Sequence, residues 1–232
     1  MLHPPLIPGE TTLLKGINAM HSPVADAFMY MLSNPGAWIA LIAVLLHILF
    51  YKKPWQEGIL FLLAIGLCIA LCDGLSSSFS KPFFARPRPT HFEGLAQTLH
   101  VVYNYKGGTF GFFSGHASNF TACAIVLSRL IDNRAHTLTT SLIVALVVYS
   151  RLYLGVHFIS DVVVGIAVGS IVGYGVSLLH NRLRSLLSPL GHVPSKELFA
   201  PTLRLWLVSL WLFLLSLIAY SWQVSHILRM LH

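Results

Sequence analysis

The sequence predicts an all-α membrane protein, a polytopic bundle of about six transmembrane helices with an amphipathic segment at the membrane interface before them. Of its 232 residues, 55% are hydrophobic and only 10% are charged, whereas a soluble domain carries about 25% charged residues. The apolar residues also gather in several runs near the roughly 20 residues that a helix needs to cross a bilayer. Composition and run length therefore agree on an integral membrane protein.

Residues 1–36 are predicted to form the interfacial segment. Between residues 11 and 33 the apolar pattern is interrupted by polar residues such as Asn18 and Asp26, which favours one or two amphipathic helices over a span. The sequence Asn-Pro-Gly at 34–36 then breaks the helix. The first twenty residues lack the charged start, apolar middle and cleavage site of a signal peptide. Insertion is therefore expected to rely on the spanning segments.

Six apolar stretches are predicted to span the membrane. The first is short, so we expect its helix to begin before residue 37 or to tilt little. The fifth carries Gly165, Gly169 and Gly173 at spacings of four, which predicts close packing against another helix. The six stretches are 37–51, 59–75, 113–130, 138–149, 162–179 and 203–221. Five of them make a core over residues 37–180, and a polar connector with the sixth makes up 181–232.

The positive charges indicate the topology. The formal net charge of +7 does not predict nucleic-acid binding, because the cations are scattered and mostly flank apolar stretches. Six spans place eight of them at one face, which is then cytoplasmic by the positive-inside rule. These are Lys52, Lys53, Arg129, Arg134, Arg182, Arg184, Lys196 and Arg204. Both termini, the long loop 76–112 and residues 150–161 then lie on the outer face.

The three cysteines, Cys68, Cys72 and Cys123, fall inside predicted spans. We interpret them as small buried apolar residues, since no disulfide framework is apparent. No set of carboxylates, cysteines or histidines has metal-binding spacing. Neither a metal nor another cofactor is therefore expected.

Residues 150–161, Ser-Arg-Leu-Tyr-Leu-Gly-Val-His-Phe-Ile-Ser-Asp, place Arg151, His157 and Asp161 between two apolar segments. His157 and Asp161 are four residues apart, so on a helix their side chains share a face. An aspartate bonded to one imidazole nitrogen fixes the tautomer and leaves the other nitrogen as a base or nucleophile. The planar guanidinium of Arg151 matches phosphate or carboxylate oxygens. A helix-end ion pair with a snorkelling arginine is the alternative for this stretch alone.

Two further stretches add anion-binding groups to the same face. In the long loop, Lys81 and Arg88 are seven residues apart among prolines that oppose a continuing helix. Ser114 and Gly115 precede the third span and offer backbone N–H groups and a hydroxyl to an anion. His116 follows them, and a bound phosphate could keep it protonated. Three cations, an amide nest, two histidines and an aspartate point to phosphoester cleavage through a phosphohistidine.

The three motifs together are specific. Lys81-x6-Arg88-Pro89, then Ser114-Gly115-His116, then Ser150-Arg151-x5-His157-x3-Asp161 resemble, in order and spacing, the signature of the type 2 phosphatidic acid phosphatase superfamily. The chain departs from the family pattern in having Phe113 before Ser-Gly-His, where proline is usual. It also lacks the usual first span and has a sixth span after the fifth.

The resemblance implies a role for each motif residue. His157 would be the nucleophile, Asp161 its orienting partner, and His116 the general acid and later the base that activates water. Lys81, Arg88, Arg151, Ser114 and Gly115 would bind the phosphate. Arg86, His91, Glu93 and Lys106 lie in the same loop and are candidates for headgroup contacts. Asp73, near the outer end of the second span, is expected to bond to Ser76, Ser77 or the motif loop.

The predicted function is a bacterial membrane lipid phosphatase of the inner membrane with its site on the periplasmic face. Its partners would be the bilayer and a lipid phosphate: undecaprenyl pyrophosphate, lipid A, phosphatidylglycerol phosphate or phosphatidic acid. The sequence does not rank these substrates and does not predict an oligomeric state. One alternative is a non-catalytic lipid-headgroup binding or transport protein, which would not need the histidines. The other is haloperoxidase chemistry, which the membrane-embedded architecture disfavours.

Overall fold

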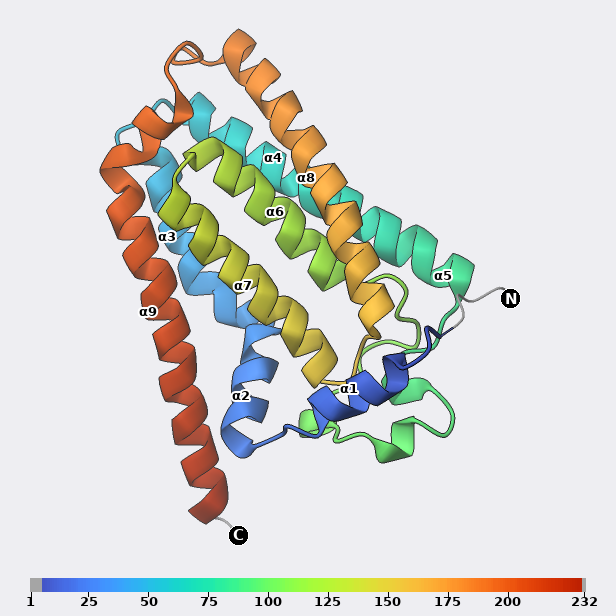
Figure 1. Cartoon of the computed structure of the whole chain (residues 1–232). Helices are drawn as coiled ribbons and strands as arrows, with labels where there is room; N and C mark the ends of the chain where they lie inside the picture. Colours follow the sequence, from blue (N-terminus) through green and yellow to red (C-terminus); the bar gives the residue numbers. More distant parts are fainter. Residues whose placement is uncertain (1–5, 231–232) are drawn as a thin grey trace.

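A computed structural model describes residues 6–230, and these residues form an all-α structure without strands. Two short helices, α1 (Glu10–Asn18) and α2 (Pro23–Leu32), come first, and a 3-10 turn at Pro35–Trp38 leads into α3 (Ile39–Phe50). The long elements lie roughly side by side, and α1 lies across the ends of α7 and α8 (Figure 1). The remaining helices are α4 (Trp55–Asp73), α5 (Lys81–Phe84), α6 (Gly115–Ile131), α7 (Arg134–Tyr153), α8 (Ile159–Leu187) and α9 (Ser195–Met230).

All six predicted spans are helical, but the count of six is not confirmed. Helix α6 has 17 residues, slightly fewer than the roughly 20 that cross a bilayer. Helices α2 and α3 reach spanning length only together, across a bend of 72°. Four helical stretches of the described chain are long and apolar enough by themselves, namely Trp55–Phe84, Arg134–Tyr153, Ile159–Leu187 and Glu197–Ile227. The number of candidate spans is therefore four, or five if the bent pair counts as one span. The division of the chain into an interfacial segment, a core and a C-terminal part, with boundaries at residues 36 and 180, stays a prediction.

The prediction of a loop from residue 76 onward was wrong. The second span continues as one helical stretch to Phe84, because a π-helical segment at Gly74–Ser80 joins α4 to α5. Pro82 falls in the first turn of α5, where a missing backbone N–H breaks no hydrogen bond. Lys81 therefore projects from a helix rather than from an extended loop.

Helices α6 and α8 pack closely, as the glycine spacing predicted. A Cβ atom added at Gly165 would lie 2.7 Å from the carbonyl oxygen of Ser114, and one at Gly173 would lie 2.6 Å from that of Ala122. Neither position has room for a side chain, so the two backbones approach each other directly. Because this contact begins at Ser114, it fixes the start of α6 against the start of α8. Two of the three motifs meet there.

The chain connections divide between the two ends of the bundle (Figure 1). The turns between α3 and α4, between α6 and α7, and between α8 and α9 gather at one end. Helix α1, helix α5, the loop 85–114 and the junction between α7 and α8 gather at the other. This arrangement agrees with the predicted alternation of the spans and brings the three motifs to one end.

Candidate active site

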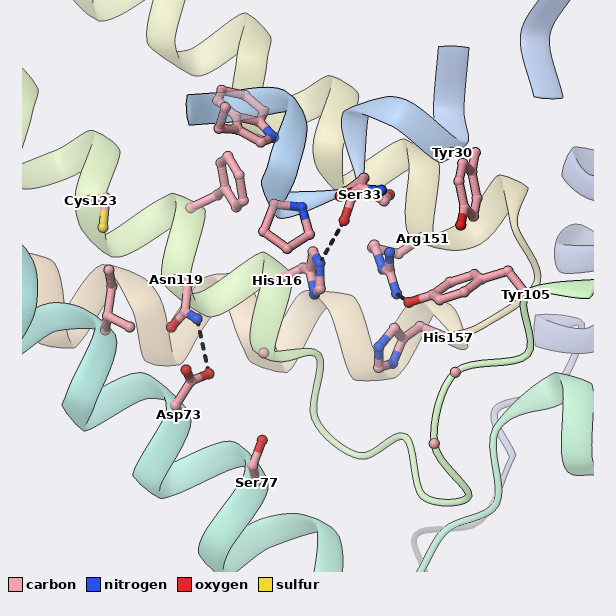
Figure 2. A pocket seen from close by; sticks show the side chains of 18 of the residues that line it. Tyr30, Ser33, Asp73, Ser77, Tyr105, His116, Asn119, Cys123, Arg151 and His157 are labelled. Carbon is pink, nitrogen blue, oxygen red and sulfur yellow. Dashed lines mark hydrogen bonds between the residues drawn. The ribbon is translucent and has the colours of Figure 1, made fainter. Parts of the chain in front are cut away.

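The three motifs line one cavity of about 720 Å³. Lys81 and Arg88 come from α5 and the loop after it, His116 from the first turn of α6, and Arg151 and His157 from the junction of α7 and α8. Figure 2 shows the side chains of Arg151, His116 and His157 around the same space. The convergence predicted from the sequence is therefore present in the structure.

His157 is fully buried and is held at both ring nitrogens. Its Nδ1 faces Asp161 Oδ2 at 3.4 Å, and its Nε2 lies 3.0 Å from Nη1 of Arg88. A guanidinium only donates hydrogen bonds, so Nε2 is the acceptor and the ring proton sits on Nδ1. Burial, and then the charges of Arg88 and Arg151, hold the pKa of His157 well below its ordinary value of 6.5. The imidazole is therefore neutral at pH 7, and its Nε2 lone pair accepts from Arg88, which also lines the cavity.

Arg88 joins the two sides of the cavity. Its Nε donates to the carbonyl oxygen of Phe110 at 3.1 Å, and its Nη1 donates to that of Val156, also at 3.1 Å. Burial and the neighbouring charge of Arg151 lower the pKa of Arg88 to about 10, so it remains cationic at neutral pH. Its planar fork ties the loop before α6 to the loop before α8 next to His157.

Arg151 has hydrogen-bond donors to spare. Its side chain is 1% exposed, and Nη2 donates to the hydroxyl of Tyr105 at 3.1 Å. Its Nε and Nη1 are buried without a partner among the described residues. Buried polar groups of native proteins are almost always paired, and Arg151 lines the cavity. Two unpaired guanidinium donors there are typical of a site that binds an anion.

The turn before α6 supplies Gly115 and His116 to the cavity, but not Ser114. The Ser114 hydroxyl is buried and accepts the N–H of Ala117 as the helix cap, and its own N–H donates to the carbonyl oxygen of Asp161 at 3.0 Å. The expected phosphate contact of Ser114 is therefore corrected to a structural role. A Cβ added at Gly115 would lie 3.3 Å from the hydroxyl oxygen of Ser76 and 3.8 Å from Lys81 Nζ, so Gly115 lies directly beside the lysine.

The turn is anchored by the π-helical segment. The hydroxyls of Ser76 and Ser80 donate to the carbonyl oxygens of Phe113 and Phe112, at 2.9 and 3.1 Å. Phe113 takes the place of the usual proline and is buried. These two bonds hold the start of α6 beside Lys81.

His116 is oriented by a residue that sequence reasoning missed. Its Nε2 lies 3.3 Å from the carbonyl oxygen of Ser33 at the end of α2 (Figure 2). A carbonyl only accepts, so Nε2 carries a proton and Nδ1 is left to exchange one. A contact between residues 83 positions apart in the chain has no signal in local sequence.

The four candidate headgroup residues do not line the cavity. Arg86 is 1% exposed and binds Asp161 and Glu10, so its predicted headgroup contact was wrong: two carboxylates already hold its guanidinium. His91, Glu93 and Lys106 are exposed on the loop outside the cavity lining, and their headgroup contacts stay predictions.

Asp73 does line the cavity, but with a different partner from the one expected. Its Oδ1 accepts the amide N–H of Asn119 at 2.9 Å (Figure 2). Neither Ser76 nor Ser77 donates to it in the described structure. Helices α4 and α6 are thereby joined beside the polar part of the cavity.

An apolar branch extends the cavity along the bundle. Trp38, Ile42, Ile69, Phe120 and Cys123 line it, from the segment before α3 and from α3, α4 and α6. The ring of Trp38 packs edge-on against Phe120, with centroids 4.9 Å apart. The cavity therefore joins an anion site to a surface for hydrocarbon.

Comparison with known proteins agrees with this geometry. The family model described as "PAP2 superfamily" matches residues 57–185. A lipid A 4'-phosphatase of Porphyromonas gingivalis is 41% identical over 222 residues, covering 95% of this chain and 94% of the relative. A lipid A 4'-phosphatase of Bacteroides thetaiotaomicron is 33% identical over 188 residues, covering 81% and 84%. The crystal structure of Aquifex aeolicus LpxE covers 72% of this chain and 93% of its own, with 27% identity and a TM-score of 0.55.

Proposed function

This chain belongs to the PAP2 superfamily and is an integral membrane lipid phosphatase, and we propose that it removes the 4'-phosphate of lipid A. The observation that supports lipid A as the substrate is the 41% identity to a lipid A 4'-phosphatase over nearly the full length of both chains. The cavity supports it, because cations and an apolar branch suit a phosphate attached to an acylated sugar. The family match and these relatives favour a phosphatase over both alternatives, a non-catalytic lipid-headgroup binding protein and a haloperoxidase.

The proposed location is the inner membrane, with the site on the periplasmic face. The end of the bundle opposite the cavity carries Lys52 and Lys53 in the connection between α3 and α4, Arg134 at the start of α7 and Arg182 near the end of α8. By the positive-inside rule that end is cytoplasmic. The cavity would then open at the outer side, where lipid A phosphates are reached from the bilayer.

In the first proposed step, Lys81, Arg88 and Arg151 bind the oxygens of the phosphate, and the Gly115 N–H at the start of α6 assists. Arg88 transfers its donor from His157 Nε2 to a phosphate oxygen, which frees the lone pair. Nε2 then attacks phosphorus, and the bond from phosphorus to the sugar oxygen breaks. His116, held protonated by the bound dianion, gives its proton to the leaving oxygen.

In the second step the phosphohistidine is hydrolysed. His116, now neutral, removes a proton from water as the water oxygen attacks phosphorus. The phosphorus–nitrogen bond breaks, its electron pair returns to His157, and inorganic phosphate is released. Asp161 keeps the Nδ1 proton in place throughout and stabilises the positive charge that forms on the ring.

The test is phosphate release by the purified protein in detergent. Lipid A, undecaprenyl pyrophosphate and phosphatidylglycerol phosphate are compared, and mass spectrometry of the lipid A product identifies the position that is cleaved. We expect release from the 4' position of lipid A and no release with His157→Ala. Turnover confined to another lipid would refute the substrate, and unchanged turnover by His157→Ala would refute the phosphohistidine.

A further inference from the structure

Behind His157, on the side away from the cavity, lies a charged cluster of which the proposed chemistry uses only Asp161. Nη1 of Arg86 donates to Asp161 Oδ1 at 2.6 Å, and Nη2 donates to Glu10 Oε2 at 2.9 Å. The exposed fractions of Arg86, Glu10 and Asp161 are 1%, 4% and 0%. Glu10 begins α1, so the cluster joins the N-terminal segment to the partner of the nucleophile.

Ser160 completes the cluster. Its backbone N–H and its hydroxyl donate to Glu10 Oε1 at 2.7 and 2.5 Å, and the hydroxyl accepts from Nη1 of Arg86 at 2.6 Å. The guanidinium also lies 4.6 Å from the centre of the Phe158 ring. Glu10 therefore holds both Arg86 and the first turn of α8, which carries Asp161.

The cluster fixes both oxygens of Asp161. Arg86 binds Oδ1, while Oδ2 accepts the N–H of Phe158 at 2.9 Å and faces His157 Nδ1 at 3.4 Å. With Oδ1 bound to Arg86 and Oδ2 bound to the N–H of Phe158, the carboxylate is held with Oδ2 facing the imidazole. The orientation of His157 thus depends on where Arg86 lies.

Glu10 also determines the net charge of the cluster behind His157. An arginine bound to Asp161 alone would neutralise it and weaken its interaction with the positive imidazole that forms during phosphoryl transfer. Because Arg86 is shared between two buried carboxylates, the cluster of Glu10, Arg86 and Asp161 has a net charge of −1. The excess negative charge lies next to His157.

We propose that Glu10 is a positioning residue for phosphoryl transfer, acting through Arg86 on Asp161 and His157. Helix α1 then belongs to the active site although none of its residues lines the cavity. The inference rests on the proposed phosphohistidine function. A purely structural Glu10 would instead affect only the amount of folded enzyme.

The test compares Glu10→Gln with a matched change at the other end of the bundle. Glutamine keeps an oxygen for Ser160 but removes the charge and sets an amide donor against Arg86. Glu57→Gln is the control, because Glu57 is also buried, pairs with Arg184 at 2.7 Å and accepts from Ser188. For each variant kcat and KM on lipid A and the inhibition constant of inorganic phosphate are measured per mole of folded enzyme.

Glu10→Gln is expected to lower kcat by about 10- to 100-fold, the effect of small misplacements in an active site. Its KM and phosphate inhibition constant should stay within about twofold of wild type, because the cations of the cavity are unchanged. Glu57→Gln should leave all three values within about twofold. A wild-type kcat in Glu10→Gln, or a loss spread equally over kcat, KM and phosphate binding, would overturn the proposal.

Ser160→Ala covers the case in which Glu10→Gln does not fold. It removes the hydroxyl between Arg86 and Glu10 and keeps the backbone bond, so a drop in kcat of about 3- to 10-fold at constant KM is expected. A wild-type kcat in this variant would also overturn the proposal. Activity in His157→Ala is a separate result, which would refute the proposed function rather than the role of Glu10.

Discussion

Replacement of Arg88 by lysine tests whether the site depends on guanidinium geometry or only on charge. In the free enzyme one planar fork contacts the carbonyl oxygens of Phe110 and Val156 and Nε2 of His157, at 3.1, 3.1 and 3.0 Å. A lysine ammonium is a single point and cannot reach the two loops and a phosphate oxygen together. Charge is kept in Arg88→Lys, but the fork is lost.

The size of the effect follows from the bonds lost. A hydrogen bond from a charged donor contributes about 1.5–3 kcal/mol, and each 1.36 kcal/mol in the barrier changes the rate about tenfold. If lysine loses one such bond to the transition state, kcat/KM should fall by about 10- to 150-fold. The carbonyls of Phe110 and Val156 lose a shared donor as well, so the melting temperature should also fall.

The assay is phosphate release from lipid A, with the folded fraction measured by size exclusion and thermal unfolding in the same detergent. Arg134→Lys is the control, since Arg134 is exposed at the opposite end of the bundle, and its kcat/KM should equal that of wild type. If Arg88→Lys retained kcat/KM within about threefold, the planar fork would be irrelevant and the mechanism above would be wrong in this respect.

Three further predictions concern the N-terminal contact, helix packing and the apolar branch. Burial alone would raise the pKa of Glu10, but hydrogen bonds from Ser160 and Ile7 and the charge of Arg86 lower it below 4.5. The carboxylate therefore stabilises the fold above about pH 4.5, and this contribution is lost as the pH falls through the folded-state pKa. In that pH range the difference in melting temperature between wild type and Glu10→Gln should disappear. A difference that does not change with pH would contradict the prediction. Gly169→Ala should lower the free energy of unfolding by about 1–3 kcal/mol, because a Cβ there would collide with the backbone of Ser118. Gly175→Ala is the control, since a Cβ at that position meets nothing within 4 Å. Equal melting temperatures of the two variants would contradict the close packing of α6 and α8. Cys123→Phe should narrow the apolar branch of the cavity. It should raise the KM for lipid A and leave the KM for a short soluble phosphate ester unchanged. An equal rise in both KM values would show that the branch does not bind the acyl chains.

Much of the site could be predicted from the sequence because its residues stand in short motifs. The spacing of His157 and Asp161 and that of Lys81 and Arg88 are local facts, and the order of the three stretches is specific. The structure brings Lys81, Arg88, Gly115, His116, Arg151 and His157 to one cavity and places Asp161 behind His157. Hydropathy likewise predicted the helical stretches, because exclusion of backbone polar groups from lipid requires helices.

The errors arose where a residue's partner is distant in the chain. Arg86 looks like the neighbouring motif cations, but its partners come from α1 and α8, 76 and 75 residues away. In the sequence nothing shows that the Ser114 hydroxyl has a partner, whereas in the structure it caps α6 by accepting the N–H of Ala117. A π-helical segment at Gly74–Ser80 has no simple periodicity by which it could be recognised.

By itself the sequence determined that this is a helical membrane protein, and it predicted which side chains would carry a phosphoryl group, since both depend on residue type and short spacing. The tertiary structure decided which of those side chains face the cavity and which are held by other protein groups. It alone revealed Ser33 behind His116, Tyr105 beside Arg151, and Glu10 and Arg86 behind Asp161. The physical reason is that buried polar groups must find partners, and packing rather than chain neighbourhood determines which partners are in reach.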